Sequence, residues 1–302
     1  MVPIGLVARK VRQMAVVGGA VVLFAAANAA AQEGTASAEA GFSPAPARLK
    51  LRVDAMAWYL GPGGELDMPS ATGLADGGDI DIDTLGYDSP RFVAMPELNI
   101  TWGDRWRVTL RGYHFDDSHT AVPGFAGQVG SVAFDSSSEL SSSYSIGSYE
   151  AEVAYRIYEF PEELVGVQDR GFFATADIIG GVRAFDLSWS VARTELGSFP
   201  GTQSVSVDDV FISPMLGTRL RLDFGNDYGF DVQLDVAGLP LGDGSNASGD
   251  VIVGGWWYPW PNVGVQIGYR AASFLLGNGD GPEDYSFGGW NQGLQFGVVV
   301  QF

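Results

Sequence analysis

The chain has 302 residues, with 17 lysines and arginines against 36 aspartates and glutamates, a formal net charge of −19 and no cysteine. The lack of cysteine excludes disulfides, and the acidic balance argues against nucleic acid as a partner, because binding it needs a basic surface. The length suits one large β domain of roughly 250 residues.

Residues 1–31 have the three-part pattern of a secretory signal peptide. Three basic residues precede an uncharged apolar run over residues 14–27, and small residues follow before a cleavage point at Gln32. The run is short for a membrane-spanning helix of about 20 residues, and no later segment approaches that length. Residues 32–47, rich in Ala, Ser, Gly and Pro, predict a flexible leader. The folded domain is therefore expected over residues 48–302.

Ten stretches of alternating apolar and polar residues follow, and each predicts a strand with one apolar and one polar face. They cover residues 48–60, 91–102, 106–117, 143–158, 171–186, 208–224, 228–239, 250–258, 263–276 and 289–302. Tight turns rich in Gly, Asn, Asp or Pro alternate with long loops, over 61–90, 118–142, 187–207, 240–249 and 277–288. After an export signal, this rhythm predicts a closed antiparallel up-and-down transmembrane β-barrel. Eight or twelve strands remain as alternatives.

One face of the predicted strands excludes charge. Along nine strands, the 55 positions of the apolar phase contain no Asp, Glu, Lys or Arg. A Lys or Arg that faces lipid at mid-membrane costs about 2–4 kcal/mol, which explains a charge-free face. We therefore expect the apolar face to contact outer-membrane lipid and the polar face to line the interior. The strand at 250–258 is apolar on both faces, so its phase stays open.

The interleaved positions carry 17 charged residues, nine basic and eight acidic. An unpaired ion in a narrow, partly dry lumen is costly, so the near balance predicts Arg–carboxylate pairs. Eight-stranded barrels are filled by their own side chains and open pores need 16 to 18 strands, so we expect a blocked lumen. The predicted members of this charge network are Lys50, Arg52, Asp54, Glu97, Arg107, Arg111, Glu150, Glu152, Arg156, Asp177, Arg183, Arg219, Arg221, Asp223, Asp231, Asp235 and Arg270.

The folded part resembles the small bacterial outer-membrane β-barrel proteins, the broad OmpA-like and uncharacterised barrel group. The resemblance rests on the export signal, on hairpins such as VGVQIGYRAASF, and on the final strand GGWNQGLQFGVVVQF with its terminal Phe. It implies that the barrel-assembly machinery is a partner, which would recognise Phe296, Val298, Val300 and Phe302. The even strand count places both termini on one side of the outer membrane, and we expect that side to be the periplasm.

Two residue groups are of metal-ligating type. His114 and Asp116 share a strand face, an arrangement that can hold Zn²⁺ and that resembles the Asp/His pairs of outer-membrane proteases. Asp79, Asp81 and Asp83 share a face, and surface Ca²⁺ would relieve their mutual repulsion. We favour solvated loops for both groups over a metal site, and no EF-hand is present. We predict no catalytic residue and no cofactor. Anionic polysaccharide, bridged by divalent ions, is the expected surface partner.

Four functions stay open from the sequence. We favour a non-enzymatic outer-membrane barrel with a charge-filled lumen and acidic surface loops. The alternatives are a narrow pore for small solutes, a membrane-embedded hydrolase that uses His114 and Asp116, and a secreted water-soluble β-barrel.

Overall fold

The computed structural model describes residues 49–69, 80–160, 171–193, 203–225, 227–238, 246–278 and 284–302. The predicted signal peptide and leader lie outside these ranges, and so does Asp79. Within the described ranges, no helix is both long enough and apolar enough to cross a membrane.

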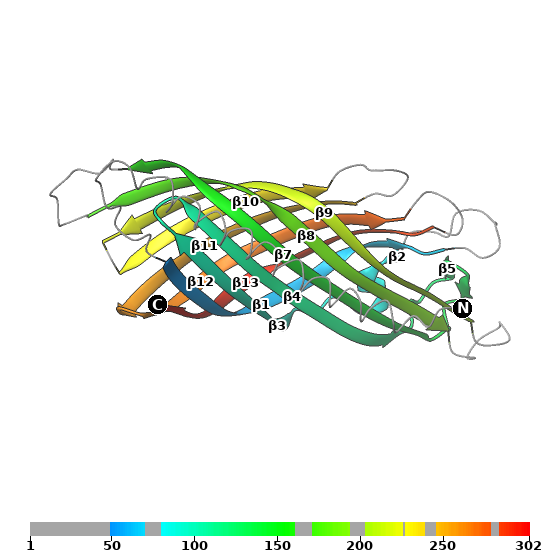
Figure 1. The fold of residues 1–302 in the computed structure, drawn as a ribbon. Helices are drawn as coiled ribbons and strands as arrows, with labels where there is room; N and C mark the ends of the chain where they lie inside the picture. Colours follow the sequence, from blue (N-terminus) through cyan, green and yellow to red (C-terminus); the bar gives the residue numbers. More distant parts are fainter. Residues whose placement is uncertain are drawn as a thin grey trace, which may run out of the picture.

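Ten long strands form the wall of a closed barrel (Figure 1). They are β1 (Leu49–Asp67), β3 (Arg91–Trp102), β4 (Trp106–Ala121), β7 (Leu140–Phe160), β8 (Phe173–Arg193), β9 (Gln203–Phe224), β10 (Tyr228–Gly238), β11 (Asn246–Trp260), β12 (Val263–Gly277) and β13 (Ser286–Gln301). Each strand pairs antiparallel with the next, and β13 pairs with β1 to close the sheet. The predicted fold class, an up-and-down barrel of ten strands, is confirmed.

The two ends of the barrel differ in their connections. Tight turns join β3 to β4, β9 to β10 and β11 to β12 at the end that also holds Phe302 and the start of β1, which we name the turn end (Figure 1). Gly103 and Gly225 have φ angles of 61° and 65°, a left-handed conformation that glycine adopts without a Cβ clash. The turns from β3 to β4 and from β9 to β10 therefore depend on glycine for their shape.

The opposite end, which we name the loop end, carries the remaining short elements. These are β2 (Ile80–Asp81), the 3-10 helix η1 (Ile82–Leu85), β5 (Gly127–Val129) and β6 (Val132–Phe134). Asp81 caps η1 through its side chain, which accepts a hydrogen bond from the backbone N–H of Asp83 at 3.1 Å. Much of the sequence predicted as long loops is thus ordered structure that closes this end.

All ten predicted strands are present, and their bounds agree best at the turn end. At the loop end they are longer than predicted: β1 continues to Asp67, β8 continues to Arg193, and β9 begins at Gln203. The predicted loops at 61–90, 118–142 and 187–207 therefore contribute to the wall. In these extensions the inward side chains are apolar and the outward ones are polar, the reverse of the rest of each strand. A strand predicted from its outward apolar residues therefore ends too early.

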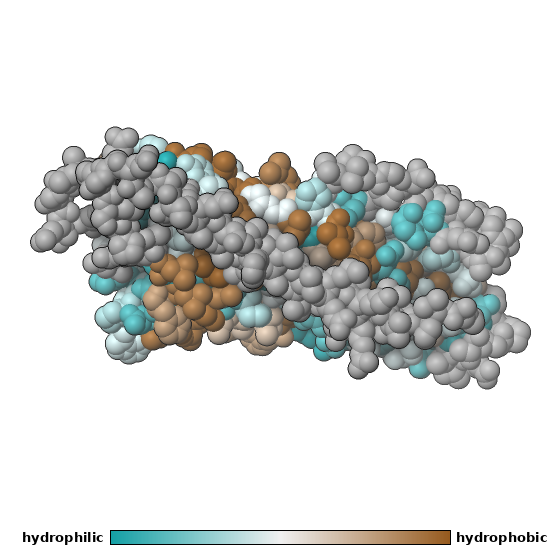
Figure 2. Space-filling view, in the orientation of Figure 1, coloured by the Kyte–Doolittle hydropathy of each residue, from teal (hydrophilic) through white to brown (hydrophobic). Residues whose placement is uncertain are grey.

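Large apolar side chains cover the outside of the half nearer the turn end. Leu216, Val236, Ile267 and Leu294 are 70, 65, 65 and 53% exposed on this surface. Figure 2 shows hydrophobic residues in brown, and the largest brown area lies toward this end. We name this surface the apolar belt. On β11, Val251 and Trp257 are exposed in the belt, while Asp250 and Trp256 are buried on the inward phase, which settles the one strand that sequence left unphased.

Toward the loop end the outward face becomes rich in hydroxyl groups. The strand register places Ser118, Ser143, Ser190 and Ser206 side by side across β4, β7, β8 and β9. The Oγ atoms of Ser143 and Ser190 lie 2.7 Å apart. A belt that suits lipid is therefore followed by a wall that suits water, as expected of a barrel that rises out of a membrane at its loop end.

We expect Leu216→Arg to lower the free energy of unfolding in lipid vesicles by about 2–4 kcal/mol, because it places a cation in the apolar belt. Ser206→Arg is the matched control, since Ser206 lies outward on the same strand beyond the belt and is exposed. Urea titrations followed by tryptophan fluorescence measure both. Equal effects of the two changes would contradict this placement of the belt.

Candidate functional site

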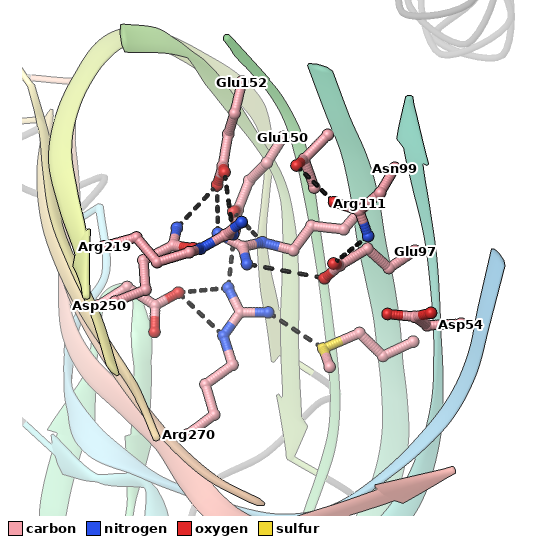
Figure 3. Close-up of polar contacts among 12 residues, drawn as sticks. Asp54, Glu97, Asn99, Arg111, Glu150, Glu152, Arg219, Asp250 and Arg270 are labelled. Carbon is pink, nitrogen blue, oxygen red and sulfur yellow. Dashed lines mark hydrogen bonds and ion pairs between the residues drawn. The ribbon is translucent and has the colours of Figure 1, made fainter. Parts of the chain in front are cut away.

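The most distinctive feature of the interior is an ion-pair network that crosses the lumen (Figure 3). Three arginines and four carboxylates from six strands form its centre, which we name the lumen network: Arg111, Glu150, Glu152, Arg183, Asp235, Asp250 and Arg270. All seven are buried, with between 1 and 6% of each residue exposed. Alternation on each strand brings them inward, because the outward positions between them belong to the apolar belt.

Glu150 on β7 is the carboxylate with the most arginine partners. Arg111 donates from Nε at 2.5 Å and Arg270 donates from Nη2 at 2.6 Å. Arg183 adds an ion pair whose nitrogen lies 3.3 Å from the same carboxylate. Because these cations come from β4, β12 and β8, one carboxylate ties together distant parts of the wall.

Asp235 and Asp250 form the second half of the lumen network. Arg183 donates to Asp235 at 2.5 Å and also forms an ion pair with Asp250 at 3.4 Å. Arg270 donates to Asp250 from Nε at 2.8 Å and also from Nη2. Asp250 was not among the predicted members, because it lies on the strand that is apolar on both faces.

Uncharged polar side chains extend the network. Gln233 donates to Glu152 at 3.0 Å and to Asp235 at 3.1 Å, and it accepts from Arg219 at 2.9 Å. Asn99 donates to Glu97 at 2.7 Å. These amides supply hydrogen bonds that the carboxylates need once water is excluded. Gln233 is a site residue that a search restricted to charged residues does not find.

The remaining predicted members lie nearer the turn end in smaller groups. Arg52 pairs with Asp54 at 2.8 Å, and Arg221 pairs with Asp223 at 2.8 Å. A further group shares one carboxylate: Arg107 and Arg156 lie 3.4 and 3.7 Å from Asp177. Lys50 is exposed at the mouth of the barrel, and Asp231 lines the same space. The structure thus places the predicted residues inside the barrel, in a central network and a mouth group.

An apolar core fills the interior between the lumen network and the loop end. Tyr144 and Trp189 stack with ring centroids 4.2 Å apart, and Tyr87, from the segment after η1, packs edge-on against both. The fully buried members of this aromatic cap include Trp58, Leu60, Leu85, Tyr87, Phe115, Leu140, Tyr144, Ile146, Leu187, Trp189 and Phe287. This apolar core was not predicted from the sequence. Apolar inward positions alternating with outward serines at 140–146 and 187–191 were the available signal.

Arg270 joins the two layers. Its guanidinium carbon lies 5.3 Å from the ring centroid of Trp58 and 5.5 Å from that of Tyr113, and Nη1 contacts the Met95 sulfur at 3.1 Å. A guanidinium held over aromatic faces gains cation–π attraction in addition to its ion pairs. The lumen network and the aromatic cap are therefore one continuous closure.

On the turn-end side the closure leaves a cavity of about 990 Å³, which we name the vestibule. Residues of the turn end, such as Asp104, Asn262 and Phe302, border it, and Arg111 and Gln233 of the interior lie at its inner end. The vestibule therefore opens at the turn end and is closed toward the loop end.

The predicted metal and hydrolase residues are arranged differently from the expectation. His114 and Asp116 do share a face, but they are exposed on the outside of the wall, where His114 Nε2 lies 3.5 Å from Ser145 Oγ. The His–Asp pair in contact is His119 with Asp117, at 2.9 Å. Within the described ranges, no group of three or more His, Cys, Asp or Glu residues is placed to hold a metal ion.

The acidic segment at the loop end contains Asp81 and Asp83. Burial, together with the negative charges of Asp81 and Asp88, raises the pKa of Asp83 above its ordinary value. Surface Ca²⁺ at this segment stays a prediction, since Asp79 lies outside the described residues.

The residues of the predicted assembly signal end the last strand. Phe296, Val298 and Phe302 are 45, 46 and 72% exposed on the outside near the turn end, and Val300 is half-buried on the same phase. In the folded barrel they belong to the apolar belt, and their recognition during assembly stays a prediction.

Comparisons with known proteins support the fold and no more specific assignment. No family model and no curated protein matches the chain. The structure aligns with the outer membrane protease OmpT of Escherichia coli at a TM-score of 0.56 and 10% identity, covering 84% of this chain and 97% of that one. The chain therefore has the outer-membrane β-barrel fold.

Two other solved barrels align less well. Ail, the attachment invasion locus protein of Yersinia pestis, gives a TM-score of 0.30 at 11% identity, over 84% of this chain and 98% of that one. Neisserial surface protein A gives 0.27 at 12% identity, over 84 and 97%. Scores this low carry no argument, and the OmpT likeness shows the fold without an activity.

We expect Arg270→Met to lower the free energy of unfolding by about 3–5 kcal/mol, because it leaves Glu150 and Asp250 with less compensation in a desolvated site. Arg221→Met is the control, since its ion pair with Asp223 is partly exposed and should contribute at most about 1 kcal/mol. Urea unfolding in lipid vesicles compares the two. A loss for Arg270→Met no larger than for the control would show that the lumen network is not desolvated.

Proposed function

We propose that this protein is a closed, non-enzymatic outer-membrane barrel whose turn end faces the periplasm and whose loop end projects from the cell surface. The observation that carries the proposal is the double closure of the lumen. The lumen network spans the interior, and the aromatic cap lies between it and the loop end.

The narrow-pore alternative conflicts with this geometry. A solute would have to displace ion pairs whose side chains are at most 2% exposed, such as Arg111 with Glu150 and Arg183 with Asp235, and then pass the stacked rings of Tyr144 and Trp189. Breaking a buried ion pair costs several kcal/mol, so spontaneous opening would be rare.

The soluble-barrel alternative conflicts with the outer surface. Leu216, Val236 and Ile267 are largely exposed on the outside, whereas Arg111, Arg183 and Arg270 are buried within. A water-soluble container requires the opposite arrangement of ions and apolar groups. The belt instead fits the expected partner, outer-membrane lipid.

The hydrolase alternative gains no support from its predicted pair. His114 and Asp116 face outward on a strand, and neither of them lines the vestibule. The pair of His119 and Asp117 also contacts Arg91, whose nitrogen lies 2.9 Å from Asp117. This ion pair gives the carboxylate a structural partner, and we assign the pair to the packing of the loop end.

The surface role that fits this architecture is presentation of the loop end, with its acidic segments, to the surroundings of the cell. The expected partners are anionic polysaccharide bridged by divalent ions at the surface, and the barrel-assembly machinery during insertion. The grouping of Asp81, Asp83 and Asp88 supports the first of these: burial, and then the charges of Asp81 and Asp88, raise the pKa of Asp83.

Planar-bilayer recording tests the closed lumen. We expect no stable single-channel steps from the purified protein, because two layers of packed side chains interrupt the path. A variant that opens both layers, with Arg111, Arg183 and Arg270 changed to Ala together with Trp189→Ala, should conduct if it folds. Stable steps from the unmodified protein would overturn the proposal.

Assembly offers a second test. We expect Phe302→Ala to reduce the rate of insertion by purified assembly machinery in proteoliposomes severalfold, while spontaneous refolding in detergent stays unchanged. Phe224→Ala, which removes another exposed belt aromatic at the turn end, is the control. Equal slowing of insertion by both variants would remove the special role of the last strand.

A further inference from the structure

The vestibule has a charge character opposite to that of the chain as a whole. Its lining carries eight Lys or Arg residues and five Asp or Glu residues. The whole sequence has 17 basic residues against 36 acidic ones. Basic residues are thus concentrated around the cavity that opens at the turn end.

The cations also stand nearer to the open space than their partners do. The side chain of Arg52 is 19% exposed against 2% for Asp54, that of Arg107 is 12% against 4% for Asp177, and that of Arg221 is 27% against 19% for Asp223. Two pairs reverse this order: Arg156 with Glu159, at 18 and 28%, and Arg111 with Glu97, deeper in the barrel, at 2 and 17%. At the first three pairs, a solute in the vestibule therefore meets guanidinium groups in front and carboxylates behind.

Two of these cations are held in place, and one has spare donors. Arg221 and Arg52 both lie over the ring of Trp256, with guanidinium carbons 4.4 and 5.8 Å from its centroid. Arg107 reaches Asp177 only at 3.4 Å, longer than the 2.7–2.9 Å of a strong charge-assisted hydrogen bond. Fixed, forked donors of this kind match the oxygens of phosphate and carboxylate groups.

We propose that the vestibule is a binding site for compact polyvalent oxyanions, small solutes that carry phosphate or several carboxylates. The inference rests on the proposed function in one respect, the compartment from which the solute comes. If the turn end faces the periplasm, the solute enters from the periplasm. Arg107 and Arg221 are the main ligands, and Arg52 supports Arg221 through Trp256. Binding requires no passage through the lumen network.

Isothermal titration calorimetry on the folded barrel in detergent, at low salt, tests the site with inorganic pyrophosphate and with citrate as separate probes. We expect one site, with affinity that falls as salt is added. Arg221→Gln and Arg107→Gln should each weaken binding about tenfold, and Asp223→Asn should tighten it severalfold because it removes a competing carboxylate. Arg91→Gln, at the loop end, should leave the affinity unchanged.

The opposite signs for Arg221→Gln and Asp223→Asn separate an electrostatic site from a general loss of structure. Weakening by both to the same extent, equal weakening by Arg91→Gln, or no binding of either probe to the unmodified protein at millimolar concentration would overturn the inference. Whichever probe binds more tightly identifies the preferred group. The conductance experiment tests the closed lumen independently. If the protein neither binds the anions nor forms channels, only the proposed vestibule site is contradicted.

Discussion

The interior charges lie where neither lipid nor bulk water solvates them, and this constraint organises the whole barrel. Taking an ion out of water costs several kcal/mol unless another ion and further hydrogen bonds compensate it. The barrel is narrow enough that other parts of the wall supply the compensation: Arg270 of β12 reaches Glu150 of β7 on the opposite side, and Arg183 of β8 reaches Asp235 of β10 past the intervening β9. Each charge is solvated by the others, and the lumen is closed as a result.

The same constraint explains the division of the molecule along its axis. In the half that carries the apolar belt, ions face inward because lipid excludes them from the outside. Beyond the belt the outside carries serines such as Ser143 and Ser190, and the inside is free to hold an apolar core around Tyr144 and Trp189. Arg270 contacts both layers of the interior, since it binds Glu150 and Asp250 of the lumen network and lies over Trp58 of the aromatic cap.

This layering gives the interior one accessible end. The aromatic cap and the lumen network together separate the vestibule from the loop end, so the proposed binding site and the proposed surface role lie on opposite sides of the closure. Solved barrels that share the architecture include a protease, and the fold alone does not choose among roles. Function in this protein has to be argued from the vestibule and from the loop-end surface.

Much of the wall followed from the sequence alone. Alternation with a period of two is a local property, and the cost of a charge in lipid acts at each position separately, so the ten strands and the inward placement of Arg111, Arg183 and Arg219 were predictable. The turn-end bounds were predictable for a similar reason, because tight turns need glycine, asparagine or proline at fixed places.

Only the tertiary structure decided which charges meet. Arg270 and Glu150 are 120 residues apart, and their contact depends on the closure of β13 against β1 and on the width of the barrel. The inward direction of Asp250 came from the pairing of β11 with β10 and β12, because its own residues are apolar on both faces. The aromatic cap lies at the level where the outer surface changes from one that suits lipid to one that suits water. That level is a property of the assembled barrel in its environment, and no single strand determines it.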